Sequence, residues 1–186
     1  MSGPTPILTV ELTVGDLTLD DLTGLVWSGS AHHLGNLAEQ IVRAETGECR
    51  MLGLALPTGL LIAIGGVDFR ARPGPSIAGA ATQTDAMVWL LSVHDAWRSL
   101  GLGTMLIGRL ELAALDHGLD RVVIEVEHDN PRAATLYRRL GYRVVGSRLD
   151  SWRTRPDQHY LTVVTVMAKT LSRSAATSRS AGGAPG

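Results

Sequence analysis

Two glycines, an arginine and the start of a helical pattern lie together in the segment "WRSLGLGTMLI", residues 97–107. Arg98 precedes the spaced glycines Gly101 and Gly103, and the segment follows the apolar run "AMVWLLSV" at residues 86–93. Glycines at the start of a helix let the backbone turn tightly, so that several N–H groups point toward one ligand. An adjacent arginine adds a charge-assisted hydrogen bond. The segment therefore predicts an anion site, and a phosphate-bearing ligand fits it best.

Two common nucleotide-binding motifs do not fit this segment. The nucleoside-triphosphate loop needs a lysine and a serine or threonine after its second glycine, whereas Gly103 is followed by Thr104 and Met105. The dinucleotide motif G-x-G-x-x-G needs a third glycine where Leu106 stands. A loop whose glycines only turn the chain into a helix is the alternative interpretation.

A second motif, "IEVEHDNPRAATLYRRLGY", occupies residues 124–142. With it, the segment Arg98-x-x-Gly101-x-Gly103 resembles the GCN5-related N-acetyltransferase (GNAT) family, whose Q/R-x-x-G-x-G/A loop holds the pyrophosphate of coenzyme A. The later segment resembles the family's N-x-x-A-x-x-L-Y-x-x-x-G-Y/F helix, matched at Asn130, Ala133, Leu136, Tyr137, Gly141 and Tyr142. The specific match runs from about residue 87 to 146, and the element order fits an N-acetyltransferase domain over residues 7–171.

The resemblance implies that acetyl-coenzyme A binds where two parallel strands, residues 86–93 and 121–127, part from one another. The pantetheine arm would pair with backbone near Leu91, and the pyrophosphate would meet N–H groups from Ser99 to Thr104. The implied coenzyme A-binding residues are Leu91, Ser92, Val93, Arg98, Ser99, Leu100, Gly101, Leu102, Gly103, Thr104, Asn130 and Tyr137.

The resemblance implies that the protein is an N-acetyltransferase. It would use acetyl-coenzyme A as a cosubstrate, and a primary amine would attack the acetyl group directly. The acceptor is left as a small molecule or a protein or peptide, and no metal is expected. A non-catalytic acyl-coenzyme A-binding module of the same fold is the alternative. A homodimer is compatible with the sequence.

Such a transfer needs a base for the amine, a donor for the oxyanion and a proton for the departing thiolate. Tyr137 is the expected acid, because the family places this tyrosine near the coenzyme A sulfur. A core tyrosine is the alternative, since Leu136 and Leu140 lie nearby on the same helix. Backbone N–H groups near Leu91 to Val93 are the expected oxyanion donors.

Glu125 is the expected base. It alternates away from Ile124 and Val126, and it resembles the base position of acetyltransferases that modify ribosomal-protein N-termini. A strand glutamate that is solvated or paired with an arginine is the alternative, and Glu127, His128 or a water relay could serve instead.

Other polar residues have weaker claims. Asn130 can cap its helix or contact the pantetheine arm, and Trp152 could shape an acceptor pocket. The pair His32-His33 reads as a solvated helix start, because adjacent residues point in different directions and no third metal ligand is evident. The pair Arg138-Arg139 is expected to face solvent, and Cys49 has no nearby histidine that would make it a nucleophile.

Hydrophobic and turn patterns predict an α/β fold. We expect strands over residues 7–14, 86–93, 121–127, 142–147 and 160–169, a hairpin over 50–69, and helices over 18–29, 32–47, 102–117 and 130–140. Loops are expected over residues 70–84 and around Trp152, and residues 172–186 read as a disordered tail. The resemblance implies a mixed, mostly antiparallel sheet of about seven strands flanked by four helices, with two parallel central strands splayed apart.

Composition narrows the class of protein. The 186 residues are 45% hydrophobic, enough for one core, and the net charge of −1 argues against general nucleic-acid binding. The single cysteine excludes an intrachain disulfide. The absence of a signal-like start or a long apolar run predicts a cytoplasmic protein without membrane contact.

Charge is uneven along the chain. Residues 1–93 carry nine acidic and four basic side chains, whereas residues 94–186 carry nine acidic and thirteen basic ones. The basic half holds the motifs expected to bind the anionic coenzyme. The acidic half, with Asp16, Asp20, Asp21, Glu39, Glu45 and Glu48, leads to the hypothesis of a cationic acceptor steered by charge.

Overall fold

The structure is a computed structural model that describes residues 9–29, 31–69, 85–155 and 158–172. Its side chains are not described at residues 31–32, 152–155 and 158–159. The elements are β1 (Thr13–Asp16), the 3-10 helix η1 (Leu19–Ser28), α1 (Ala31–Glu45), β2 (Cys49–Ala55), β3 (Leu61–Asp68), β4 (Ala86–Val93), η2 (Asp95–Trp97), α2 (Leu102–Asp116), β5 (Arg121–Glu127), α3 (Pro131–Arg139), β6 (Arg143–Arg155) and β7 (Gln158–Thr170). The loop expected over residues 70–84 and nearly all of the expected tail lie outside the described residues.

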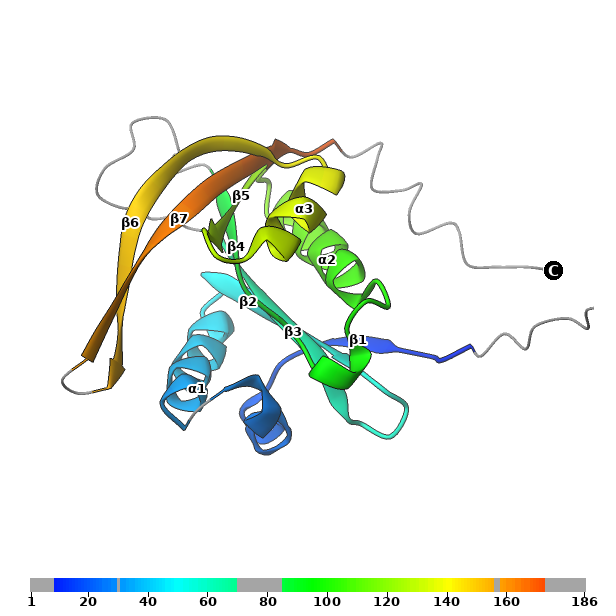
Figure 1. The fold of residues 1–186 in the computed structure, drawn as a ribbon. Coiled ribbons are helices and arrows are strands. Elements are labelled where there is room, and N and C mark those ends of the chain that lie inside the picture. The colour runs from blue at the N-terminus through cyan, green and yellow to red at the C-terminus, as the bar shows by residue number, and fades with distance from the viewer. Residues whose placement is uncertain (1–8, 30, 70–84, 156–157, 173–186) are drawn as a thin grey trace, which may run out of the picture.

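Seven strands form one mixed sheet in the order β1-β2-β3-β4-β5-β7-β6. Every neighbouring pair is antiparallel except β4 and β5, which are parallel. The parallel pair follows from the crossover through α2, since a helical connection returns the chain to the same end of the sheet. This confirms the expected fold class (Figure 1).

Helices cover both faces of the sheet (Figure 1). On one face, α2 and α3 pack over a core that includes Leu106, Leu110 and Ile124. On the other face, η1 and α1 enclose a smaller core around Leu25 and Leu37. Both cores are mostly aliphatic, and the larger one also contains Phe69, Tyr137 and Tyr142. The sheet opens between β4 and β5, where these two strands separate.

The parallel strands separate after a short contact. β4 and β5 pair only from Ala86↔Val122 to Val88↔Ile124, and β5 then continues beside β7. At this point β4 carries an irregularity, with Leu90 at φ 55° and a register shift opposite β3 between Ile64 and Gly66. A positive φ is uncommon outside glycine and turns the backbone locally. The β5-facing edge of residues 89–93 therefore has no strand partner in the described chain.

Within the described part of the strand expected over residues 7–14, only Thr13 and Val14 lie in β1, which continues to Asp16. The helix expected from Thr18 is confirmed as the 3-10 helix η1, with Thr18 as its N-cap. The loop expected around Trp152 is wrong, because this residue lies within β6, paired with Tyr160. β6 is an edge strand that pairs with β7 along one side, so residues 148–155 extend it without the apolar periodicity by which strands are recognised in sequence. None of the described helices is long and apolar enough to span a membrane.

Candidate active site

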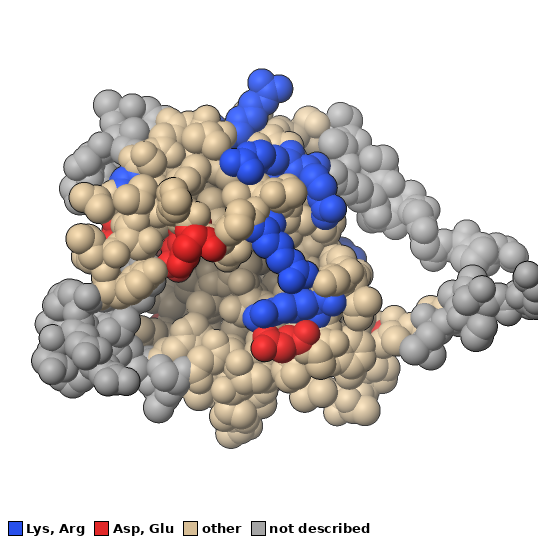
Figure 2. Space-filling view, viewed as in Figure 1, with Lys and Arg blue, Asp and Glu red and all other residues tan. Residues whose placement is uncertain are grey.

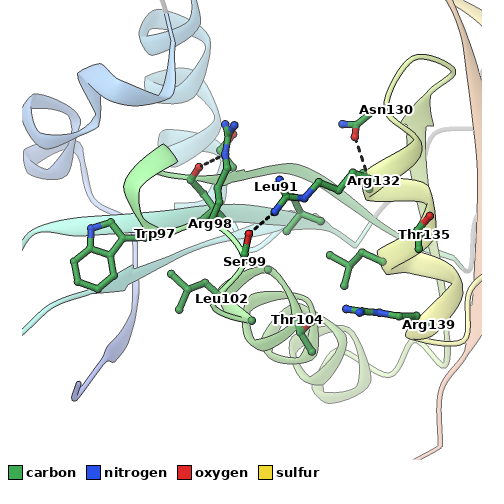
Figure 3. A pocket seen from close by; sticks show the side chains of 16 residues that line it. Leu91, Trp97, Arg98, Ser99, Leu102, Thr104, Asn130, Arg132, Thr135 and Arg139 are labelled. Carbon is green, nitrogen blue, oxygen red and sulfur yellow. Dashed lines mark hydrogen bonds between the residues drawn. The ribbon is translucent and has the colours of Figure 1, made fainter. Parts of the chain in front are cut away.

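A cavity of about 680 Å³ opens beside the separated end of β4 (Figure 3). The start of α2 forms one wall and α3 forms the opposite wall. Most of the implied coenzyme A-binding residues meet here, although they come from three elements. The lining residues are Leu91, Ser92, Val93, Trp97, Arg98, Ser99, Gly101, Leu102, Gly103, Thr104, Asn130, Arg132, Ala133, Thr135, Leu136 and Arg139.

The N-terminus of α2 supplies backbone donors to this cavity. Gly101 caps the helix at φ 82°, and no side chain hydrogen-bonds the first turn. The first intrahelical bond from this turn is Met105 N–H to Gly101 O, so the N–H groups of residues 102–104 have no partner within the helix. The helix dipole adds partial positive charge at the same place. This end of the cavity is suited to an anion.

Gly103 matters at this wall because its missing side chain leaves the backbone accessible. A Cβ built there would meet only Leu136 Cδ2, at 3.5 Å, which is ordinary van der Waals contact. A larger side chain would therefore fit the fold but would extend toward the space where a ligand approaches the N–H groups. Leu100, in contrast, is not among the lining residues and is 64% exposed, so the structure leaves it apart from the implied set.

Three arginines, Arg98, Arg132 and Arg139, line the cavity. Arg98 Nη2 lies 2.6 Å from Asp95 Oδ1, and Arg98 Nε donates to Val93 O at 3.2 Å. Arg132 reaches across the mouth of the cavity and donates to Ser99 Oγ at 2.7 Å (Figure 3). Figure 2 shows Lys and Arg side chains gathered along one side of the hollow in this face, over α2 and α3. Their charge complements phosphate.

Sequence reasoning missed Arg132 and Arg139. Arg139 is exposed, as expected, but its side chain also lines the cavity, whereas Arg138 does not. The signal was present, because residues spaced by three, four and seven share one helix face. Arg132, Thr135, Leu136 and Arg139 follow this spacing, and all four line the cavity.

A second compartment of about 250 Å³ occupies the gap between β4 and β5. It shares Leu91, Asn130 and Ala133 with the first cavity, so the two spaces adjoin. Tyr137 reaches it from α3 and Glu125 from β5. The remaining lining residues are Val88, Trp89, Leu90, Ile124, Val126, Glu127, Asp150 and Val164.

Tyr137 is nearly buried at this junction, with 7% of its surface exposed. Burial raises the pKa of Tyr137 to about 12, because the phenolate loses its hydration. No hydrogen bond to its hydroxyl is found among the described residues. The side chain therefore combines both sequence interpretations: its ring belongs to the core, and its protonated hydroxyl lines the compartment.

Glu125 is held by an arginine. Arg148 Nε donates to Glu125 Oε1 at 2.8 Å, and Arg148 Nη2 donates to Oε2 at 2.7 Å. Arg148 also pairs with Asp150, with Nη1 3.0 Å from Oδ1. Hydrogen bonding to Glu125, together with the Asp150 pair, raises the pKa of Arg148 above its usual range, so the guanidinium is firmly charged. The alternative of an arginine-paired glutamate is thus realised, with the carboxylate still lining the compartment.

The other candidate bases differ in position. Glu127 lines the compartment and accepts a hydrogen bond from Tyr160 Oη at 3.2 Å. His128 is exposed and is not among the lining residues. Asn130 does cap its helix, since its Oδ1 accepts from Ala133 N–H at 3.1 Å, and it also lines both spaces. The side chains of His32 and Trp152 lie outside the described set.

Acidic residues of the N-terminal half lie elsewhere. Asp16 Oδ1 lies 2.6 Å from Arg50 Nε, and Glu48 Oε2 lies 3.2 Å from Arg43 Nε. The negative charges of these two carboxylates are therefore partly neutralised. None of the N-terminal acidic residues lines either compartment. Cys49 is buried against α1, and burial raises the pKa of its thiol. The negative charge beside the gap comes instead from Glu125, Glu127 and Asp150.

The sequence profile of the acetyltransferase (GNAT) family matches residues 29–142. The chain belongs to this family. The matched region includes β4, the glycine loop, the start of α2, β5 and α3, which together form most of both compartments. No curated protein matches the chain by sequence.

Solved structures of acetyltransferases share the fold. The PaiA N-acetyltransferase of Thermoplasma acidophilum, solved with coenzyme A, is 16% identical, with a TM-score of 0.59 over 86% of this chain and 99% of that one. YncA of Salmonella typhimurium, solved with acetyl-CoA, is 16% identical, with a TM-score of 0.65 over 88% and 95%. The ribosomal-protein-S18-alanine N-acetyltransferase of Escherichia coli is 18% identical, with a TM-score of 0.60 over 87% and 95%.

Proposed function

We propose that this GNAT protein transfers an acetyl group from acetyl-CoA to a primary amine by direct attack within a ternary complex. The observation that carries the proposal is the meeting of two unlike spaces at the β4–β5 gap. One is lined by helix N–H groups and arginines, and the other by Tyr137 and Glu125. Similar folds have been solved with coenzyme A or acetyl-CoA, which supports the choice of donor.

Coenzyme A fits the larger cavity in chemical terms. The free N–H groups of residues 102–104 suit its pyrophosphate, and Arg132 and Arg139 can neutralise phosphate charge from the facing helix. The unpartnered edge of β4 at residues 91–93 suits the amides of the pantetheine arm. Asn130 can contribute its amide N–H group, because only its oxygen is used by the helix cap.

Residues of the smaller compartment would then carry out the separate steps of acetyl transfer. Glu125 would take a proton from the ammonium of the acceptor, so that the amine nitrogen can bond to the acetyl carbonyl carbon. A backbone N–H near Leu91 would hydrogen-bond the oxyanion. As the carbon–sulfur bond breaks, Tyr137 would donate its proton to the thiolate. The second proton of the amine nitrogen then leaves through solvent and restores the Tyr137 hydroxyl, and Glu125 releases the first proton to solvent. The raised pKa of Tyr137 keeps this proton available across the working range of pH.

The competing function is an acyl-CoA-binding module without turnover. Purified full-length chain should be assayed for thiol release from acetyl-CoA across polyamines, amino acids, aminoglycosides and basic or acidic peptides. Isothermal titration should measure acetyl-CoA binding in parallel. We expect saturable binding and thiol release that depends on an amine. Tight binding with no turnover of any acceptor class would favour the binding module, and absence of binding would overturn both.

A further inference from the structure

Arg148 reaches across a strand to contact Glu125. The sheet order places β7 between β5 and β6, and Arg148 on β6 lies opposite Val164 of β7, whereas Glu125 on β5 lies opposite Val166. Despite this separation, two donors of one guanidinium engage both oxygens of the carboxylate, at 2.8 and 2.7 Å. Such a two-point contact fixes the orientation of the carboxylate as well as its distance.

Asp150 holds the other side of the same guanidinium. It lies two residues further along β6, on the same face, and its oxygens are 3.0 and 3.1 Å from Arg148 Nη1 and Nη2. The side chains of Arg148 and Glu125 are only 21% and 18% exposed, so the pair is partly shielded from water. Arg148 is therefore held between two carboxylates, and its guanidinium in turn fixes the carboxylate of Glu125.

We propose that Arg148 is a positioning residue that orients the Glu125 carboxylate toward the gap. This proposal rests on the proposed function, in which Glu125 is the base. A carboxylate has about four lone-pair positions, and Arg148 uses one on each oxygen. The remaining positions can accept a proton from an acceptor amine. The catalytic contact belongs to Glu125, and Arg148 acts through it.

The surroundings of Glu125 explain why it needs a fixed cation. Among the described residues, the compartment presents Glu127 from β5, Asp150 from β6, and Tyr137 and Asn130 from the side of α3. β4 contributes Trp89 and Leu90, and β7 contributes Val164, none of which carries a charge. Arg148 places a positive charge beside Glu125 and Asp150 and holds both carboxylates in fixed positions. Loss of Arg148 should therefore leave the Glu125 carboxylate without a fixed orientation.

A purely structural ion pair between β5 and β6 is the alternative, and the chain offers a matched control for it. Arg50 on β2 pairs with both oxygens of Asp16 on β1, at 2.6 and 3.0 Å, and lines neither compartment. R148Q, R148K and R50Q should be compared with the unmodified chain by thermal melting, acetyl-CoA titration and pH profiles of kcat/KM. The acceptor used is the best amine from the thiol-release panel.

For R148Q, we expect kcat to fall on the order of 10-fold to 100-fold, because small misplacement of a catalytic group has effects of this size. The KM for the amine and the acetyl-CoA affinity should stay nearly unchanged, because Arg148 lines neither compartment. R148K keeps the charge without the two-point contact, so it should recover kcat only in part. R50Q should keep the kcat of the unmodified chain.

The double variant E125Q/R148Q separates failure of this proposal from failure of the assigned base. If Arg148 acts through Glu125, the double variant should be no slower than E125Q alone. A defective E125Q beside an R148Q that behaves like R50Q would overturn the positioning role and leave the base intact. An E125Q with the activity and pH profile of the unmodified chain would overturn the base. If R148Q melts too early to assay, R148K decides the question: a kcat equal to that of the unmodified chain in a stably folded R148K would overturn the positioning role.

Discussion

The two compartments that meet at the β4–β5 gap bind by different means. The larger cavity relies on backbone groups, namely the N–H groups at the start of α2 and the unpartnered edge of β4, with arginines added around them. The smaller compartment relies on side chains: Arg148 contacts Glu125 and Asp150, and Glu127 lines the same space. One space is therefore basic and built from main chain, whereas the other is acidic and built from a charge network.

This difference indicates which part of the site can change without loss of the fold. Backbone donors at a helix N-terminus recognise phosphate whatever the side chains are, so that cavity depends mainly on shape and on small residues such as Gly103. A network of side chains depends on the identity of each member. The negative charge beside the gap lies in the acidic compartment, and none of the described acidic residues of the N-terminal half lines it.

The largest effect should come from Y137F, which tests the junction of the two spaces. The substitution removes one oxygen and keeps the ring in the core. General acid catalysis typically contributes ~10²–10⁴-fold, so kcat should fall within this range. Acetyl-CoA affinity and the melting temperature should stay nearly unchanged. Because Tyr137 holds its proton up to about pH 12, the defect should be equal at every pH between about 6 and 10.

Two measurements check this prediction: kcat and kcat/KM should fall together, and titration should show normal acetyl-CoA binding. A fully active Y137F would assign the leaving proton to water and leave Tyr137 with its packing role alone.

E125Q should have the next largest effect, and its pH dependence should differ from that of Y137F. A base matters most when the amine arrives protonated, so we expect a loss of roughly 10²-fold near neutral pH. The defect should shrink as pH approaches the pKa of the amine, roughly 8–10 for typical amines. Rates measured from pH 6 to 10 provide the check. A defect that is flat with pH would move the base to Glu127, His128 or a water chain.

Much of the architecture could be predicted from sequence because it depends on local signals. Gly101 and Asn130 mark helix starts, and Gly118 marks a helix end at φ 87°. The order of strands and helices then fixes which strands are parallel. The backbone-built cavity was predictable for the same reason, since a glycine loop after a strand implies free N–H groups at a known place.

The acidic compartment could not be predicted in the same way. Arg148 and Glu125 are 23 residues apart and come together only because β6 is a full strand beside β7, where the sequence suggested a loop. No local sequence pattern predicts a side-chain contact between two strands that are separated by a third. The cavity-lining positions of Arg132 and Arg139 were not predicted for a different reason. Their helical spacing is visible in the sequence, but the cavity that they face is not.

G103V tests the backbone-built cavity. The added methyl groups should block approach to the N–H groups of α2 and lower acetyl-CoA affinity by roughly 10-fold to 100-fold, since hydrogen bonds to charged groups contribute about 1.5–3 kcal/mol. G108V is the matched control, because Gly108 lies in the same helix, outside the cavity, with nothing within 4 Å of its built Cβ. Titration calorimetry and melting curves measure both variants. Equal affinities in G103V and G108V would remove the pyrophosphate assignment.

The smallest effect is expected from the arginines of α3, and it sharpens the contrast between backbone and side-chain binding. R132Q and R139Q should each weaken acetyl-CoA binding about 2-fold to 5-fold, because both side chains line the cavity but remain exposed to solvent, where single charges contribute about 1 kcal/mol or less. R138Q is the matched control, since Arg138 carries the same charge on the same helix without lining the cavity. The difference between R132Q or R139Q and R138Q should shrink as salt rises, because the screening length is about 8 Å at physiological ionic strength. Equal losses in all three variants would show a diffuse attraction by the basic surface, with no specific contact from Arg132 or Arg139.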